Sequence, residues 1–143
     1  MNLEQRLRAL LRSRFLRFGA VGAAGFVVDL TVLWLMLHLA GFDPYSSRIV
    51  SIFCAMTFTW WGNRNLTFAE HAATGSGAEI AREWFKFMLA NGLGALINYA
   101  TYSLFVRFAP PPFSNPLVAT AIGVGVGLIF NFVLSKRFVF RAK

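Results

Sequence analysis

One carboxylate lies within a long apolar segment of this chain. Asp29 is the only ionised side chain from Phe18 to Leu39, a segment of 22 residues. At about 1.5 Å per residue the segment could cross a bilayer core of about 30 Å, which would place Asp29 roughly 16 Å deep. A carboxylate at that depth costs about 2.5–3.5 kcal/mol on membrane-insertion scales. Because intramembrane carboxylates usually serve function, we interpret Asp29 as part of a substrate or proton site.

A second polar face, later in the chain, matches the face that holds Asp29. The two faces comprise Gly22, Gly25 and Asp29, and Asn91, Gly94 and Asn98. Two such faces at midplane depth predict a packed polar centre or a cavity between them. The alternative role for Asp29 is structural, in which its protonated side chain hydrogen-bonds Asn98 or a hydroxyl across a helix interface.

Enzymatic chemistry has little support in the sequence. His38 and His71 are far apart, and no Cys/His cluster has the spacing of a metal site. No Ser/His/Asp set is apparent, and the chain has no G-x-x-x-x-G-K-[ST] motif for ATP binding. We therefore expect no enzyme activity, no metal and no cofactor.

Four apolar segments must position these polar residues, at about 18–39, 45–62, 85–106 and 116–134. The chain of 143 residues is 57% hydrophobic and only 14% charged, and its mean hydropathy is +0.56. A soluble domain of this size would need more charged residues on its surface. The sequence therefore predicts an all-α membrane protein with four transmembrane helices.

The net charge of +8 follows the ends of these segments. Twelve of the 14 Lys and Arg residues precede the first segment, lie between the second and third, or follow the fourth. Only Arg48 and Arg107 lie near the other two loops. Since cytoplasmic loops are enriched in Lys and Arg, both termini and the linker 64–83 are predicted to be cytoplasmic. We attribute the positive charge to this topology and to anionic membrane lipids, and we expect no nucleic acid as a partner.

The N-terminal residues 3–15, LEQRLRALLRSRF, place four leucines on one helical face and arginines over much of the rest. This pattern predicts a short interfacial amphipathic helix that lies on the cytoplasmic leaflet and leads into the first span. The apolar segment that follows is too long for a signal peptide and has no clear cleavage site after it.

The two halves of the chain resemble an internal duplication. The first span aligns with the third at a shift of 69 residues, which matches Asp29 with Asn98, and the second aligns with the fourth at a shift of 72. Small residues recur at every fourth position, as Ser47, Ser51, Ala55, Thr59 and Asn63 and as Ala119, Gly123, Gly127, Asn131 and Ser135. Such ridges let helices approach closely in lipid. We expect two parallel-repeat helical hairpins in a single domain, 1–143, and a homo-oligomer, a dimer, formed through a ridge.

Three stretches carry a resemblance to a known family, namely RFLRFGAVGAAGFVVDL, TWWGNRNLTF and IFNFVLSKRFVF. From about Phe15 to Phe140 the chain resembles the GtrA-like family of four-span membrane proteins. The exit of the second span departs from the family pattern, with Thr59 where the fourth span has Asn131. The resemblance implies flipping of a polyprenyl-phosphate-linked monosaccharide, such as undecaprenyl-phosphate-glucose, from the cytoplasmic to the periplasmic leaflet of the bacterial inner membrane. Such lipids supply cell-surface polysaccharides such as O-antigen.

This implied function gives roles to polar residues at two depths. Near the midplane, sugar hydroxyls need amide, hydroxyl and carboxylate partners, and the candidates are Asp29, Asn91, Asn98, Thr59, Asn131 and Tyr102. At the cytoplasmic ends, a phosphodiester needs cations with hydrogen-bonding neighbours, and the candidates are Arg17, Asn63, Arg64, Asn65, Lys86, Ser135, Lys136 and Arg137. Each of these cations could instead anchor a span at the interface.

Two other functions stay open on the sequence. One is a membrane scaffold that recruits a polyprenyl-phosphate glycosyltransferase, which would make that enzyme a partner. The other is a proton-coupled exporter like the small multidrug-resistance proteins, which also have four spans and one membrane carboxylate. A flippase would need no ATP site, because an inside-negative potential favours outward movement of one negative charge by about 2.3 kcal/mol per 100 mV.

Overall fold

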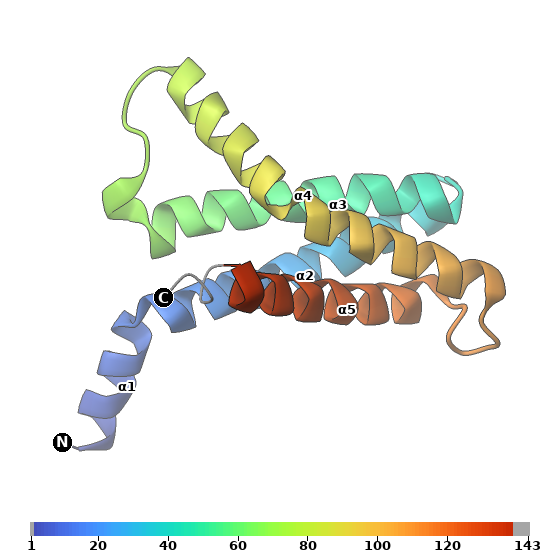
Figure 1. The fold of residues 1–143 in the computed structure, drawn as a ribbon, viewed down its shortest axis with the longest axis horizontal. Coiled ribbons are helices and arrows are strands. Elements are labelled where there is room, and N and C mark those ends of the chain that lie inside the picture. Colours follow the sequence, from blue (N-terminus) through green and yellow to red (C-terminus); the bar gives the residue numbers. More distant parts are fainter. Residues whose placement is uncertain (1, 139–143) are drawn as a thin grey trace.

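The computed structural model describes residues 2–138, and their side chains through Phe130 apart from some near the N-terminus. The chain forms α1 (Leu3–Arg12), α2 (Arg14–His38), α3 (Pro44–Gly62), α4 (Gly77–Phe108) and α5 (Pro116–Phe138) (Figure 1). No β-strand occurs in residues 2–138, so the expected all-helical class is confirmed.

Side-chain caps decide where two of the helices begin. The Oγ of Ser13 accepts a hydrogen bond from the backbone N–H of Leu16 at 3.2 Å, so α2 starts directly after α1. One carboxylate oxygen of Asp43 accepts hydrogen bonds from the backbone N–H groups of Tyr45 and Ser46, at 2.9 and 3.0 Å. These bonds satisfy N–H groups that have no partner within α3, and they fix the end of the turn after α2.

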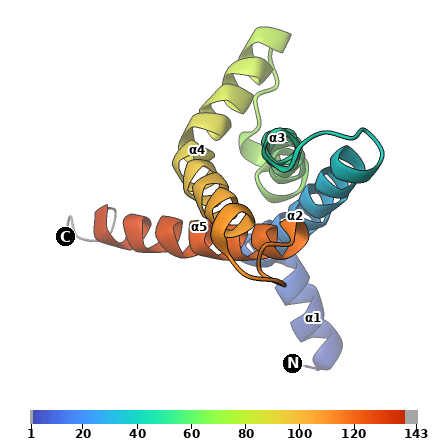
Figure 2. The ribbon, with the colours of Figure 1, turned by 90° about the vertical axis from the view of Figure 1, so that its right-hand side faces the viewer.

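The four long helices pair as two hairpins. α2 packs against α3 and α4 packs against α5, while contacts between α3 and α4 join the two pairs. The connecting loops, 39–43 and 109–115, lie at the same end of the molecule (Figure 1). Toward the opposite end, the start of α4 and the end of α5 diverge from the first hairpin (Figure 2). The two loops therefore lie at one end of the molecule, and an internal repeat of two spanning hairpins stays a prediction.

The small-residue ridges pack inside each hairpin. A Cβ atom added to Gly25 on α2 would clash with the side chain of Thr59 on α3. In the second hairpin, a Cβ atom added to Gly127 on α5 would lie 3.1 Å from the carbonyl oxygen of Gly94 on α4. These contacts use residues of both ridges within one chain, and a dimer through a ridge stays a prediction.

The third apolar segment belongs to a longer helix than hydropathy predicts. α4 begins at Gly77, whereas the third span is expected from 85, so the connection after α3 is shorter than the linker 64–83. That connection contains a π-helical turn over Asn63–Thr67 and a 3-10 turn over Ala69–His71.

Length and apolar composition single out one helix. Within the described part of the chain, α2 is long and apolar enough to cross a membrane, over Leu16–His38. The apolar part of α5 in this range, Pro116–Phe130, is shorter.

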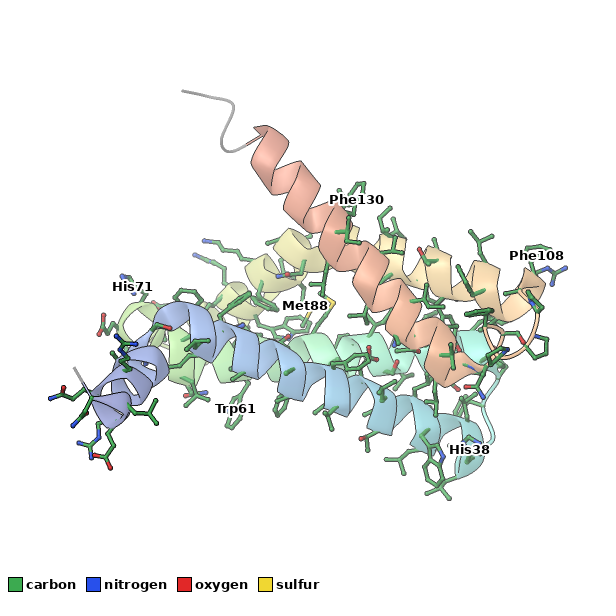
Figure 3. The ribbon with its side chains drawn as sticks, turned by 90° about the horizontal axis from the view of Figure 1, so that it is seen from below. His38, Trp61, His71, Met88, Phe108 and Phe130 are labelled. Atoms are coloured by element: carbon green, nitrogen blue, oxygen red, sulfur yellow. The ribbon has the colours of Figure 1, made fainter. Side chains whose placement is uncertain are left out.

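The described surface is largely apolar, whereas the interior holds polar groups. Large apolar side chains such as Trp61 and Phe108, which are 54% and 72% exposed, point outward (Figure 3). The buried polar side chains include Asp29, Ser47, Arg48, Ser51 and Thr120. This distribution is the reverse of that in a soluble protein, and it is expected for helices surrounded by lipid.

Candidate functional site

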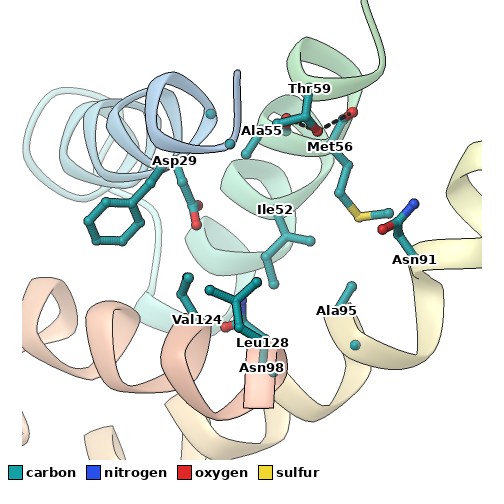
Figure 4. A pocket seen from close by; sticks show the side chains of 15 residues that line it. Asp29, Ile52, Ala55, Met56, Thr59, Asn91, Ala95, Asn98, Val124 and Leu128 are labelled. Carbon is teal, nitrogen blue, oxygen red and sulfur yellow. Dashed lines mark hydrogen bonds between the residues drawn. The ribbon is translucent and has the colours of Figure 1, made fainter. Parts of the chain in front are cut away.

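A cavity of about 220 Å³ lies between α2, α3, α4 and α5 (Figure 4). Glycines make room for it, and those in its wall are Gly22, Gly25, Gly94 and Gly127. The polar groups in its wall are Asp29, Thr59, Asn91 and Asn98. The structure therefore brings four of the residues expected near the midplane to one cavity.

Asp29 is paired with Arg48, a buried residue that is not part of the cavity wall. The Asp29 carboxylate accepts a hydrogen bond from Nη1 of Arg48, and both side chains are buried. The same nitrogen donates to Ser51 Oγ at 2.8 Å, and Nη2 donates to Asn98 Oδ1 at 2.9 Å. Arg48 therefore ties α2, α3 and α4 together, and Asp29 meets Asn98 through Arg48 rather than directly.

Sequence reasoning missed Arg48 as a site residue. Its backbone does lie near the loop 39–43, close to the start of α3 at Pro44, but its side chain is fully buried. The sequence held a signal that could have found it. One Arg lies inside the expected span 45–62 and one Asp inside the neighbouring span, and opposite charges in adjacent spans favour an ion pair.

Tyr102 supports the ion pair and lies outside the cavity wall. Its ring is fully buried, and the Arg48 guanidinium carbon lies 5.4 Å from the ring centroid. The Tyr102 hydroxyl donates a hydrogen bond to the backbone oxygen of Pro44 at 2.9 Å. Since its hydroxyl is used by the start of α3, Tyr102 positions Arg48 in this structure and is not placed to meet a sugar.

The remaining polar groups of the cavity wall bond within their own helices. The Thr59 hydroxyl donates to the backbone oxygens of Ala55 and Met56, at 3.0 and 2.9 Å (Figure 4). The Asn91 amide nitrogen donates to the Phe87 oxygen at 2.9 Å, while its side chain points toward Met56 across the cavity (Figure 4). Such local bonds leave a hydroxyl oxygen and an amide group free to exchange with a ligand.

A second cavity, of about 350 Å³, lies between the end of α3 and the start of α4. Aromatic and charged side chains share its wall, which is lined by Trp60, Asn63, Arg64, Phe68, His71, Ala72, Glu83, Lys86 and Phe87. Both cavities are lined by residues of α3 and α4, with Thr59 and Asn91 in the first and Trp60 and Phe87 in the second.

Glu83 organises this second cavity. Its carboxylate accepts hydrogen bonds from Arg64 Nη1 at 2.7 Å, from the Trp60 indole at 3.1 Å and from the Ala73 backbone N–H at 2.7 Å. Partial burial raises the pKa of Glu83, but the hydrogen bonds from Ala73, Arg64 and Trp60 outweigh it, so the pKa lies below its usual value. Arg64 also donates to the Ala73 backbone oxygen. Glu83 therefore holds the connection after α3 against α4, a role that the sequence did not reveal.

The other expected phosphate-binding residues are dispersed. Arg17 donates to the Leu66 backbone oxygen at 2.9 Å, and Asn65 donates to the Trp61 backbone oxygen at 2.7 Å. Neither Arg17 nor Asn65 lines either cavity, whereas exposed Lys86 does. The expected residues Asn131, Ser135, Lys136 and Arg137 have side chains outside the described residues.

These features define the class of protein. Helices with an apolar surface and a buried, ion-paired centre are typical of a helical membrane protein. The chain belongs to the GtrA/DPMS transmembrane domain family, whose sequence profile matches residues 17–140. No curated protein and no solved structure matches the chain.

Proposed function

We propose that this protein flips a polyprenyl-phosphate-linked monosaccharide from the cytoplasmic to the periplasmic leaflet of a bacterial inner membrane. Membership of the GtrA/DPMS family makes it a membrane protein related to glycosyl lipids. The observation that carries the proposal is the central cavity, in which Asp29, Asn91 and Asn98 line a space between four otherwise apolar helices. In this arrangement α2, α3, α4 and α5 each span the membrane, with both termini in the cytoplasm.

The central cavity has the chemistry that a sugar in transit would need. Hydroxyl groups moved into hydrocarbon lose their hydrogen bonds to water, which is unfavourable unless protein groups replace them. Thr59, Asn91 and Asn98 offer neutral donors and acceptors beside the Asp29 carboxylate. The prenyl chain needs no such partners, so it can stay in the surrounding lipid while the sugar moves.

The second cavity supports capture at the cytoplasmic end. Trp60, Phe68 and Phe87 give it flat apolar walls, and such walls suit a sugar ring. Since Arg64 is already paired with Glu83, the more available cation for a phosphodiester is Lys86. Arg17, Asn63, Asn65, Ser135, Lys136 and Arg137 belong to the same cytoplasmic level in the proposed topology.

The exporter alternative is disfavoured by the ion pair. A carboxylate that captures cationic drugs must be available to them, whereas Asp29 is occupied by Arg48. The scaffold alternative makes a different demand, which is binding of a glycosyltransferase without lipid movement. Both alternatives are therefore outcomes of one experiment.

The test is transport in liposomes that contain the purified protein. A polyprenyl-phosphate-glucose is placed in one leaflet, and its appearance in the other is followed with an enzyme that cannot cross the bilayer. We expect wild-type protein to move the lipid faster than it moves in empty liposomes. Asn91→Ala should move it at least about tenfold more slowly than wild type, because a polar partner of the sugar is lost. Leu96→Ala is the matched control on α4, since Leu96 is 62% exposed and should face lipid.

Folded protein that moves no glycolipid would refute the proposal. Co-purification of a glycosyltransferase with such protein would favour the scaffold. Drug efflux without glycolipid movement would favour the exporter.

A further inference from the structure

Arg48 is the one charged side chain that the fold buries completely among the described residues. Its Nη1 is bonded to Asp29 and Ser51 and its Nη2 to Asn98, but its Nε–H has no hydrogen-bond partner in the described structure. Buried polar groups without a partner are rare. Arg48 lies behind the wall of the central cavity, where it bonds the wall residues Asp29 and Asn98. A buried guanidinium in that position could bind an anion if its present partners move.

We propose that Arg48 is the anion-binding residue of the central cavity, and that Asp29 is a resident counter-ion which an incoming phosphodiester displaces. This inference rests on the proposed function, because it identifies the residue that would bind the negative charge of the lipid near the midplane during flipping. It adds a site at a second depth, since the cations expected to meet phosphate lie at the cytoplasmic ends.

The geometry places the exchange at the cavity wall. Asp29 and Asn98 line the cavity from α2 and α4 (Figure 4). Arg48 bonds both of them from α3. Movement of the Asp29 carboxylate would open the guanidinium to the cavity. The Tyr102 ring beside the guanidinium and the Ser51 hydroxyl would hold it in place while its counter-ion changes.

The ion pair has the form of an exchangeable contact. Asp29 meets Arg48 through one oxygen, Oδ1, and one nitrogen, Nη1. A carboxylate that forms a fork with guanidinium uses two oxygens and two nitrogens, and that arrangement is stronger and more specific. A phosphodiester shares one negative charge between two non-bridging oxygens, so it could bond Nη1 and Nη2 together, in place of Asp29 and Asn98. The anion would thereby make two bonds to the guanidinium where Asp29 makes one.

Arrival of the lipid would change the charge of the centre. Asp29 and Arg48 carry opposite charges, and a phosphodiester would add one negative charge beside Arg48. Asp29 and Arg48 face each other, and the Tyr102 ring on α4 lies beside Arg48. The residues that α5 contributes to the cavity wall are not titratable, namely Val124, Gly127 and Leu128.

Binding measurements on single variants test this inference. The protein in nanodiscs is titrated with a short-chain polyprenyl-phosphate-glucose, and separately with an alkyl glucoside that has no phosphate. Asp29→Asn keeps an oxygen acceptor but removes the competing charge, so we expect it to bind the phosphate lipid about tenfold more tightly. Arg48→Gln should bind that lipid at least about tenfold more weakly, with the alkyl glucoside unchanged.

Two further variants keep the test decisive. Asp29→Asn with Arg48→Gln removes both charges, which protects the fold if Arg48→Gln alone does not fold, and it should also lose the phosphate-dependent part of binding. Thr101→Ala is the control, since the Thr101 hydroxyl bonds the Ile97 oxygen of its own helix and lies outside the cavity wall.

The outcomes separate this inference from the proposed function. Phosphate-lipid binding that is weakened equally by Asp29→Asn and Arg48→Gln would make the pair a structural contact and overturn the inference. Binding that is unchanged in both variants would overturn it as well, with the flippase proposal intact. Failure of folded wild-type protein to bind the phosphate lipid would overturn both.

Discussion

At the residue scale, the ion pair between Asp29 and Arg48 determines how the centre of the molecule responds to mutation. Each charge is buried, and each is stabilised by the other. Removal of one partner from a buried pair leaves an uncompensated charge, which typically destabilises a protein by about 3–5 kcal/mol. Replacement of both partners by apolar groups is commonly much less harmful.

A double-mutant cycle on this pair should therefore be strongly non-additive. We expect Asp29→Ala and Arg48→Leu each to lower the Tm in detergent. The Tm loss of the double variant should be smaller than the sum of the two single losses. The measurement is thermal unfolding of the four proteins in the same detergent. Additive losses would mean that the two side chains act independently.

Glu83 should make stability depend on pH at the other cavity. Its pKa is lowered in the folded state by the hydrogen bonds from Ala73, Arg64 and Trp60, which outweigh the effect of burial. A carboxyl whose pKa is lower when folded binds protons more readily when unfolded. Its stabilising effect is therefore fully present above the unfolded pKa, near 4.5, and is lost as the pH falls through the folded pKa.

The comparison that isolates this effect is wild type against Glu83→Gln. We expect the Tm of Glu83→Gln to be lower at pH 7, and the difference to shrink as the pH is brought below 4.5. Melting curves over this pH range provide the measurement. A constant difference at all pH values would show that the charge of Glu83 contributes nothing.

At the element scale, glycines on α5 set how closely the second hairpin can pack. A Cβ atom added to Gly123 would lie 2.7 Å from Asn98 Oδ1 and 2.8 Å from the Asn98 backbone oxygen. Gly125, on the same helix, has no atom within 4 Å of the corresponding position. The two glycines thus form a matched pair for mutation.

Gly123→Ala should destabilise the protein, because α4 and α5 must move apart or the Asn98 side chain must shift. Overpacking of this kind typically costs about 1–3 kcal/mol. Gly125→Ala should be neutral or slightly stabilising, since Ala has the higher helix propensity. Thermal unfolding of both variants decides the matter, and equal effects would contradict the packing described for α4 and α5.

Much of the helical framework could be predicted from the sequence. Each expected apolar segment falls within or near one helix, because apolar runs of this length have few other stable forms. The early start of α4 could not be predicted this way, since residues 77–84 include Glu79, Arg82 and Glu83 and their mean hydropathy is too low to mark a span. The central site was only half predicted. Asp29 stands out in the sequence as a lone charge. Its pairing with Arg48 could not be predicted, because it depends on how α2, α3 and α4 pack together.

At the scale of the whole molecule, the proposed topology predicts which loops face each side of the membrane. A Cys54→Ser background removes the single cysteine, which then allows one new cysteine at a time. Phe113→Cys, at a position 47% exposed in the outer loop, should react in intact cells with a maleimide that cannot cross the membrane. Thr74→Cys, at an exposed position on the connection after α3, should react only after the cells are opened. The reverse pattern would contradict the assignment of both termini to the cytoplasm.

Apolar side chains cover the molecule, and an ion pair and two cavities lie within it. The central claim is that this interior carries a charged sugar lipid across the membrane. In the proposed mechanism, movement of the lipid and binding of its phosphate are separable, because Asp29 displaces the anion from Arg48 after each passage.

The most direct test is the rate at which a polyprenyl-phosphate-monosaccharide crosses proteoliposomes that hold wild type or Asp29→Asn. We predict that wild type moves the lipid, and that folded Asp29→Asn moves it at least about tenfold more slowly although it binds it. No movement by either protein would contradict the flippase account. Equal movement by both would leave a flippase in which Asp29 has only a structural role.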